Sequence, residues 1–171
     1  MERRSVEAIF EALNRCGSRY LVVGGLAVVA HGFVRLTADI DLVLDPDPAA
    51  LRRAIEALSA LGYRPRAPVE FAEFADPEKR RLWARDKGLT VFSVFSPGHR
   101  ATEVDLFLES PFDFDRAYAR AARFQLADGV DGTFVGLEDL IAMKRAAARP
   151  QDLEDVEGLR SLEGSKERPD A

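Results

Sequence analysis

The sequence predicts an α/β fold, in which a small mixed β-sheet is flanked by helices, and three observations support this. The 171 residues are 47% hydrophobic, enough for one domain with a substantial core. Segments with apolar residues at helical spacing alternate with short apolar runs of strand length. Two of the short runs alternate apolar and acidic positions, as strands with one buried face do. We therefore expect one domain over residues 1–162, followed by a polar, disordered tail over 163–171.

The first half of the chain predicts helix, strand, helix, strand and helix in that order. Apolar residues three and four apart indicate the first and last of these helices, and glycines mark the ends of all three, at Gly17, Gly32 and Gly62. The middle helix is inferred because its segment is too short for a strand that pairs and turns. These elements are expected at residues 3–16, 21–23, 26–31, 38–44 and 48–61.

The second half predicts an extended piece, a helix near residues 77–85 and then a hairpin. Alternating strands at residues 89–95 and 103–108 are joined by Ser96-Pro97-Gly98-His99, which has the composition of a turn. After the hairpin we expect, in order, a helix at residues 113–122, short strands at 123–126 and 133–135, and helices at 137–148 and 151–162.

Composition excludes several classes of protein. The net charge of −5 argues against binding of nucleic acid through overall charge. Cys16 is the only cysteine, so no intramolecular disulfide partner exists, and this fits a reducing cytoplasm. The N-terminus has charges where a signal peptide would be apolar, and the longest apolar run, residues 20–30, is about half of a membrane span. We therefore expect a soluble, cytoplasmic protein with no membrane partner.

The acidic residues of two predicted strands point to metal chemistry. Asp39 and Asp41 lie two apart in one strand and so share a face, and Asp105 occupies the corresponding face of a later strand. If the strands are neighbours, three carboxylates converge and raise one another's pKa unless a cation neutralises them. Ligands that are all carboxylate oxygens favour Mg²⁺ or Mn²⁺ over zinc.

A glycine pair precedes these acids. Gly24-Gly25 ends a strand and opens a helix, so a phosphate can approach the backbone N–H groups closely. Arg35 and Thr37 could add a cation and a hydroxyl to the same anion. A triphosphate placed on these groups would bring its other oxygens over the acids.

This combination resembles the nucleotidyltransferase superfamily that includes DNA polymerase β. Its members share a Gly-Gly or Gly-Ser turn, a D-x-D pair and a third acid in a later strand, which here are Gly24-Gly25, Asp39-Ile40-Asp41 and Asp105. Three segments, GGLAVVAHG at 24–32, RLTADIDLVLD at 35–45 and DLIAMKRAAARPQDLEDVEGL at 139–159, are similar to the AbiEii-type toxin nucleotidyltransferases and their short relatives. The resemblance covers roughly residues 5–162.

The resemblance implies a nucleotidyltransferase fold whose C-terminal helices close a nucleotide cleft. It implies transfer of a nucleoside monophosphate from an NTP to a hydroxyl of an RNA, a protein or a small molecule, with tRNA and a partner protein among the acceptors and with a toxin–antitoxin setting. Asp39, Asp41 and Asp105 would hold Mg²⁺ or Mn²⁺, and Asp105 would help to deprotonate the acceptor. The residues that would contact the triphosphate are Gly24, Gly25, Arg35, Thr37 and Lys144.

Two acids that follow Lys144 in the sequence have alternative interpretations. Asp152 and Asp155 either pair with Arg149 and orient their helix, or lie at the surface.

Two other functions remain open from the sequence. One is a non-catalytic nucleotidyltransferase-fold protein that acts as an antitoxin-like binding partner, because Leu26 stands where many members have serine and the C-terminal half is short. The other is a glycosyltransferase, since its D-x-D motif also binds a metal-bound nucleotide.

Overall fold

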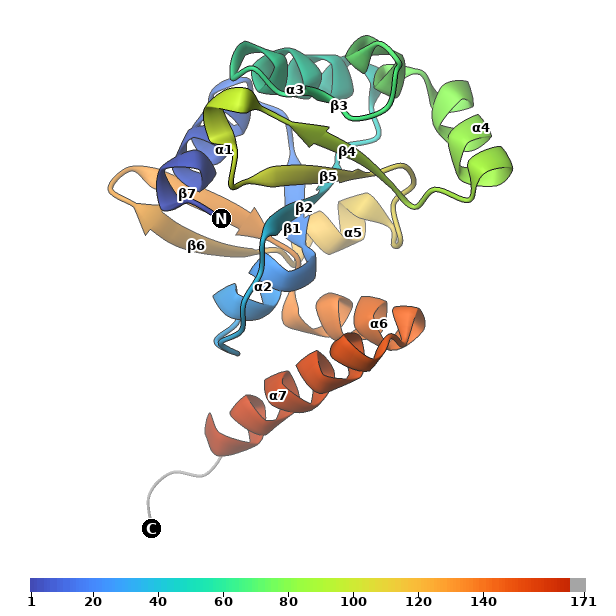
Figure 1. The fold of residues 1–171 in the computed structure, drawn as a ribbon. Coiled ribbons are helices and arrows are strands. Elements are labelled where there is room, and N and C mark those ends of the chain that lie inside the picture. The colour runs from blue at the N-terminus through green and yellow to red at the C-terminus, as the bar shows by residue number, and fades with distance from the viewer. Residues whose placement is uncertain (167–171) are drawn as a thin grey trace.

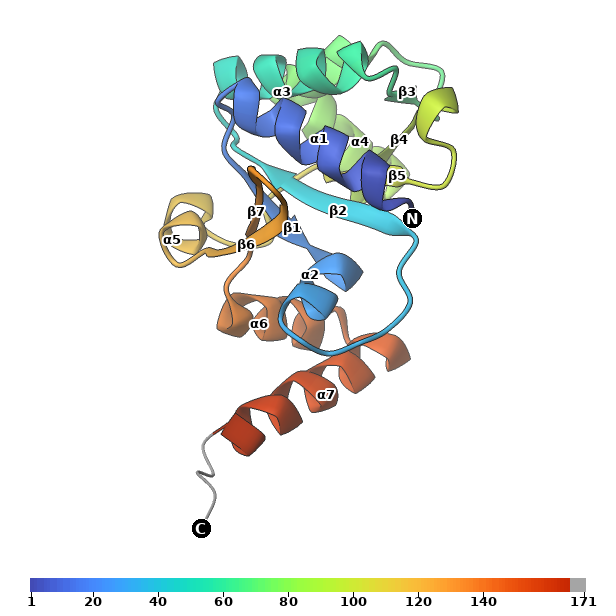
Figure 2. The same cartoon turned by 90° about the vertical axis from the view of Figure 1, so that its left-hand side faces the viewer.

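A computed structural model describes residues 1–166, in which seven strands form one mixed sheet with helices on both faces (Figures 1 and 2). The strands follow the spatial order β3-β4-β5-β2-β1-β7-β6. In chain order they are β1 (Tyr20–Val23), β2 (Asp39–Leu44), β3 (Arg64–Pro65), β4 (Val91–Phe95), β5 (Glu103–Phe107), β6 (Ala122–Ala127) and β7 (Val130–Phe134).

The helices surround the sheet on two sides. In chain order they are α1 (Arg3–Arg15), α2 (Gly24–Ala30), α3 (Pro48–Ala60), α4 (Pro77–Lys87), α5 (Phe114–Ala119), α6 (Leu137–Ala147) and α7 (Pro150–Lys166), with 3₁₀ turns η1 (Phe71–Ala75) and η2 (Pro97–His99). Helices α1 and α3 lie together on one side of the sheet, and α2, α6 and α7 lie on the other (Figure 2). Among the described residues, no helix combines the length and apolarity that a membrane crossing requires.

Strand pairing confirms the mixed sheet and the hairpin expected from the sequence. β4 and β5 pair antiparallel, β1 and β2 pair antiparallel, and β2 and β5 run parallel as direct neighbours. Ile40 and Leu42 of β2 are fully buried, whereas Asp39 and Asp41 on the alternate positions are partly exposed. The period-2 pattern therefore sets which face of β2 carries the acids.

Two α-helices begin with a side-chain cap followed by a proline. The Asp47 carboxylate accepts hydrogen bonds from the N–H groups of Ala49 and Ala50 at 3.0 and 2.8 Å, and Pro48 occupies the first turn of α3. Asp76 and Pro77 have the same roles at α4. These caps explain why α3 and α4 start at prolines.

Several expected boundaries were wrong: the helix expected at 113–122 is α5, which ends at Ala119, and the strand expected at 133–135 is β7, which begins at Val130. Two further differences affect the site or the tail. α2 begins at Gly24 rather than at residue 26, because Gly24 takes a φ of +63° that turns the chain directly from strand into helix. α7 extends to Lys166, so residues 163–166, expected in the tail, are helical. Gly164 lies inside this helix, where glycine costs about 1 kcal/mol without forcing a stop. Residues 167–171 of the expected tail lie outside the described part of the chain.

Candidate functional site

The three predicted acids line one cavity. Asp41 of β2 is the direct register partner of Asp105 on the parallel neighbour β5, and Asp39 is the partner of Glu103. Asp39, Asp41 and Asp105 all line a cavity of about 850 Å³, which Gly24 and Gly25 line as well. The expectation that the two acidic strands are neighbours is thereby confirmed. Only a long-range pairing could bring these residues together, because more than 60 residues of chain separate them.

Burial and repulsion between neighbouring acids raise the pKa values of Asp39 and Asp41. Burial, followed by the charges of Asp105 and Asp39, raises the pKa of Asp41 to about 6. Burial and then the charge of Asp105 also raise the pKa of Asp39. Among the residues whose side chains are described, none of the three acids forms an ion pair with a lysine or arginine. The cavity thus contains negative charge that no lysine or arginine among the described side chains neutralises by a direct ion pair.

The glycine pair lies directly beneath the polar groups of the cavity. A Cβ atom on Gly24 would overlap the carboxylate of Asp41, and one on Gly25 would lie 2.6 Å from both Arg35 Nη2 and Thr37 Oγ1. The N–H of Gly25 also donates a hydrogen bond to the Asp41 carboxylate. Sequence reasoning expected these amides to contact phosphate and missed their contact with Asp41.

Arg35 and Thr37 lie on the loop from α2 to β2 and line the same cavity. Arg35 Nε lies 3.0 Å from Asp155 Oδ1 of α7, and Arg35 Nη1 donates to the carbonyl of Leu36 at 3.0 Å. The hydroxyl of Thr37 donates to the carbonyl of Asp39 at 3.4 Å. The structure therefore brings both residues beside the glycine pair, as their proposed contacts require.

Lys144 is buried between two acids of the next helix. Its ammonium lies 2.8 Å from Asp152 Oδ1 and 2.7 Å from Asp155 Oδ2, and only 5% of the residue is exposed. Arg149 Nε donates to the other oxygen of Asp152 at 2.7 Å. The alternative that Asp152 and Asp155 lie at the surface is wrong, since both are buried. Lys144 also lines the cavity, and its role with a nucleotide stays a prediction.

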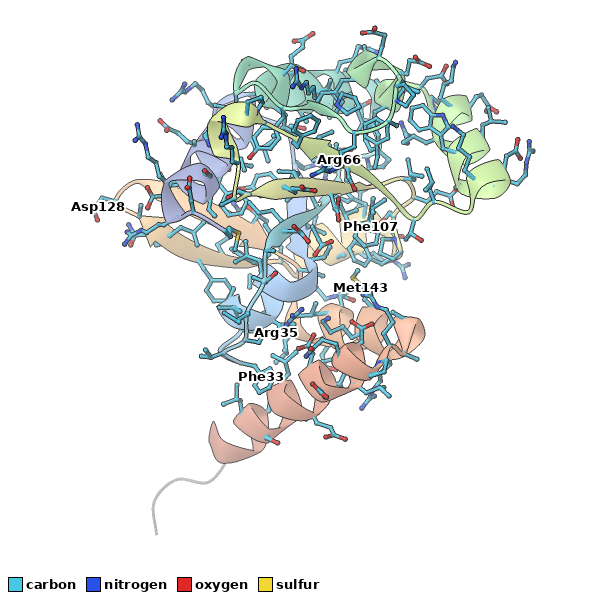
Figure 3. The ribbon with its side chains drawn as sticks, viewed as in Figure 1. Phe33, Arg35, Arg66, Phe107, Asp128 and Met143 are labelled. Atoms are coloured by element: carbon cyan, nitrogen blue, oxygen red, sulfur yellow. The ribbon has the colours of Figure 1, made fainter. Side chains whose placement is uncertain are left out.

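An apolar wall of the cavity was not foreseen. Phe107, the last residue of β5, and Phe112 line the cavity, and so do Leu140 and Met143 of α6. Figure 3 labels Phe107 and Met143. The available signal was the spacing of Phe107, which lies two residues after Asp105 and so on the same face of the strand. The cavity thus combines an acidic part with an apolar part, as small-molecule sites generally do.

The donor set fits a hard divalent cation. All three candidate ligands are carboxylates. Burial and then the charges of Asp105 and Asp39 raise the pKa of Asp41, and a bound cation would oppose both effects. In residues 1–166, however, no three acidic, histidine or cysteine side chains lie close enough together to form a ready-made metal site. The chemistry of the acids therefore suits Mg²⁺ or Mn²⁺, while the choice of ion and its coordination stay predictions.

Comparisons with known proteins agree with this geometry. A family profile described as "Nucleotidyltransferase of unknown function (DUF6036)" matches residues 4–161. Among solved structures, the lincomycin-bound lincosamide antibiotic adenylyltransferase LnuA has a TM-score of 0.61 at 13% identity, with coverage of 95% of this chain and 98% of that one. The complex of ANT(2″)-Ia with adenylyl-2″-tobramycin has a TM-score of 0.57 at 14% identity, with coverage of 96% and 90%. No curated protein matches the sequence.

These likenesses confirm the nucleotidyltransferase fold expected from the sequence. The matched family supports the superfamily that the resemblance implied, but it does not support the AbiEii type.

Proposed function

The chain belongs to the family of nucleotidyltransferases described as DUF6036, and from that premise we propose that it transfers a nucleoside monophosphate from an NTP to a hydroxyl of a small molecule. One observation carries the proposal. Asp39, Asp41 and Asp105, contributed by two adjacent parallel strands, line one cavity beside Gly24-Gly25. Nucleotidyl transfer needs carboxylates of this kind close to a place where a triphosphate can lie.

The proposed reaction is a displacement at the α-phosphorus of the NTP. The acceptor hydroxyl oxygen forms a new bond to that phosphorus, the bond to the bridging oxygen of the β-phosphate breaks, and diphosphate leaves. We assign acceptance of the hydroxyl proton to Asp105, because β5 lies on the far side of β2 from β1, the strand that leads into the glycine pair. Asp39 and Asp41 remain ionised, so that their negative charge is available to bind cations.

Divalent cations complete the proposed site. Asp39, Asp41 and Asp105 would hold Mg²⁺ or Mn²⁺, which when bound neutralises the triphosphate and stabilises the attacking and leaving oxygens. Their unpaired charge and the raised pKa of Asp41 support this assignment.

We assign the triphosphate contacts to Gly24, Gly25, Arg35, Thr37 and Lys144. Arg35 and Thr37 are supported by the position of their polar atoms over Gly25 and by their place in the lining of the cavity. Lys144 is supported by its place in the cavity wall and by its charge, which lowers the pKa of Asp41 against the effect of burial. Paired with two acids, it acts as part of a charged cluster rather than as a free cation.

The size and lining of the cavity favour a small acceptor over tRNA or a protein. A volume of about 850 Å³ lies within the range of small-molecule sites, and the wall of Phe107, Phe112 and Met143 is apolar. The two structural neighbours carry an antibiotic or its adenylylated product, according to their descriptions. A toxin–antitoxin setting would instead require label to appear in RNA or protein.

The test separates these acceptors directly. The protein is incubated with each α-labelled NTP, Mg²⁺ and a cell extract, and the products are divided into small-molecule, RNA and protein fractions. Label in the small-molecule fraction, with release of diphosphate, is the expected result. Label confined to RNA or protein would contradict the small acceptor, and label in no fraction with any NTP would contradict nucleotidyl transfer itself.

A further inference from the structure

The loop between α2 and β2 lies along the C-terminal helix α7 (Figures 2 and 3). Its residues alternate in exposure: Phe33, Arg35 and Thr37 are partly buried, whereas Val34 and Leu36 are 85% and 95% exposed. An extended segment with this alternation presents one face to a neighbouring surface. Here that surface is α7, because Arg35 and Phe33 both contact it.

One face of α7 makes these contacts. Asp155 pairs with Arg35, a Cβ on Gly158 would overlap the ring of Phe33, and Leu162 Cδ1 would lie 3.6 Å from a Cβ on Gly32. Residues at spacings of three and four share a helix face, and the loop runs past them in the opposite direction. Gly158 has no side chain at the point where the Phe33 ring packs closest to the helix.

Asp155 lies at the centre of a charged cluster next to the cavity. The cluster consists of Arg35, Lys144, Arg149, Asp152 and Asp155. Asp155 is fully buried, and its two oxygens lie 3.0 Å from Arg35 Nε and 2.7 Å from Lys144 Nζ. Asp152 pairs with Lys144 and Arg149 instead. Asp155 is thus the acid that joins Arg35, whose guanidinium lies over Gly25, to both C-terminal helices.

We infer that α7 is part of the nucleotide-binding apparatus, with Asp155 as the positioning residue that holds Arg35 over Gly25. Asp155 does not line the cavity; it acts through Arg35, and Gly158 admits the Phe33 ring that anchors the same loop. Without the carboxylate, Arg35 retains its long, flexible side chain but loses its fixed direction. The inference rests on the proposed function in one respect, since it takes the ligand to be an NTP.

The test is a double-mutant cycle on nucleotide affinity. The full chain is titrated by calorimetry with Mg²⁺ and the NTP that the wild type binds best. Asp155→Asn is expected to weaken binding by at least about tenfold, because it removes the buried charge that forms the ion pair with Arg35. In an Arg35→Ala background, adding Asp155→Asn is expected to weaken nucleotide binding by less than about a further twofold. The reason is that the guanidinium that Asp155 positions is already absent. An equal loss in both backgrounds, or no loss in either, would overturn the inference.

Two variants separate the positioning of Arg35 from other effects of removing the Asp155 charge. Glu157→Gln removes the same charge from an exposed place on the same helix, and it is expected to leave affinity unchanged. In the wild type, Asp155→Asn also removes one of the two acids that pair with the buried Lys144. Lys144→Met therefore serves as a second background, in which this side effect is absent. A tenfold loss on adding Asp155→Asn is still expected in that background, and its absence would contradict the role of Arg35.

A measurement made without nucleotide distinguishes failure of the proposed nucleotidyl transfer from failure of the proposed positioning of Arg35 by Asp155. The Nε–H signal of Arg35 in ¹H–¹⁵N spectra is expected to be protected from solvent exchange in the wild type and in Glu157→Gln, and to lose protection in Asp155→Asn. If the wild type binds no NTP but this pattern holds, the proposed function fails while the positioning by Asp155 stands. Equal protection in Asp155→Asn would reject the positioning.

Discussion

The carboxylate of Asp41 packs directly against the Cα of Gly24, so that any side chain at position 24 would occupy its place. Gly24 also takes a φ of +63°, and the next N–H, that of Gly25, donates to the same carboxylate. The glycine turn is therefore the support of a candidate metal ligand as well as a proposed phosphate contact. This double role explains why the turn and the acid belong to one site.

Gly24→Ala should therefore both destabilise the protein and abolish transfer. Gly88→Ala is a matched control, because Gly88 has a similar φ of +61° but no atom within 4 Å of an added Cβ. Each change should cost about 1–2 kcal/mol for the left-handed backbone, and Gly24→Ala should cost more because Asp41 must move. Urea unfolding measures the difference. Equal costs, with transfer retained in both variants, would contradict the contact between Gly24 and Asp41.

Asp41 should make the metal-free protein less stable as pH rises. Its pKa is about 6 in the folded state against an ordinary 3.8, so the folded state binds the proton more tightly than the unfolded state does. The free energy of unfolding should fall between about pH 4 and pH 6, by up to about 3 kcal/mol, and then level off.

Asp41→Asn should remove that fall, because asparagine carries no titrating charge and can still accept the hydrogen bond from Gly25. The variant should be more stable than the wild type above pH 6 in EDTA, and Mg²⁺ should stabilise only the wild type. Unfolding curves at several pH values give the comparison. A wild type that gains stability from pH 4 to 6 relative to the variant would show the sign to be wrong.

Lys144→Met should destabilise the protein strongly, by about 3–5 kcal/mol, because it leaves Asp152 and Asp155 buried with fewer partners. Arg149→Ala should cost much less, since the Arg149 side chain is 77% exposed. Thermal unfolding of the two variants provides the measurement. Similar small losses in both would mean that the cluster does not hold α6 to α7.

Phe112→Ala should raise the KM of one substrate while leaving kcat nearly unchanged, because Phe112 belongs to the apolar wall of the cavity and carries no group that can take part in the reaction. Leu82→Ala, at a half-exposed apolar position on α4, should change neither constant. Steady-state kinetics with NTP and acceptor varied in turn identifies which substrate the wall contacts. A fall in kcat with both KM values unchanged would be inconsistent with a binding wall.

The alternation of residues along the strands made the three acids predictable from the sequence, whereas the charged cluster around Asp155 could not be predicted. Asp39, Asp41 and Asp105 follow a period-2 pattern in which apolar neighbours are buried, so their shared face can be read locally. The pairing of Arg35 with Asp155 joins residues 120 positions apart, and no local pattern encodes it. Gly24 and Gly25 show the same difference. Their turn was evident from the sequence, but its contact with Asp41 depends on how α2 packs against β2.

The most direct test of nucleotidyl transfer compares acidic residues inside and outside the cavity. Transfer of label from an α-labelled NTP is measured for the wild type, Asp39→Asn, Asp41→Asn and Asp128→Asn, where Asp128 lies exposed far from the cavity (Figure 3). Circular dichroism verifies that each variant is folded. Transfer should persist in the wild type and in Asp128→Asn and disappear in the other two. Undiminished transfer in folded Asp39→Asn and Asp41→Asn would contradict the proposed mechanism.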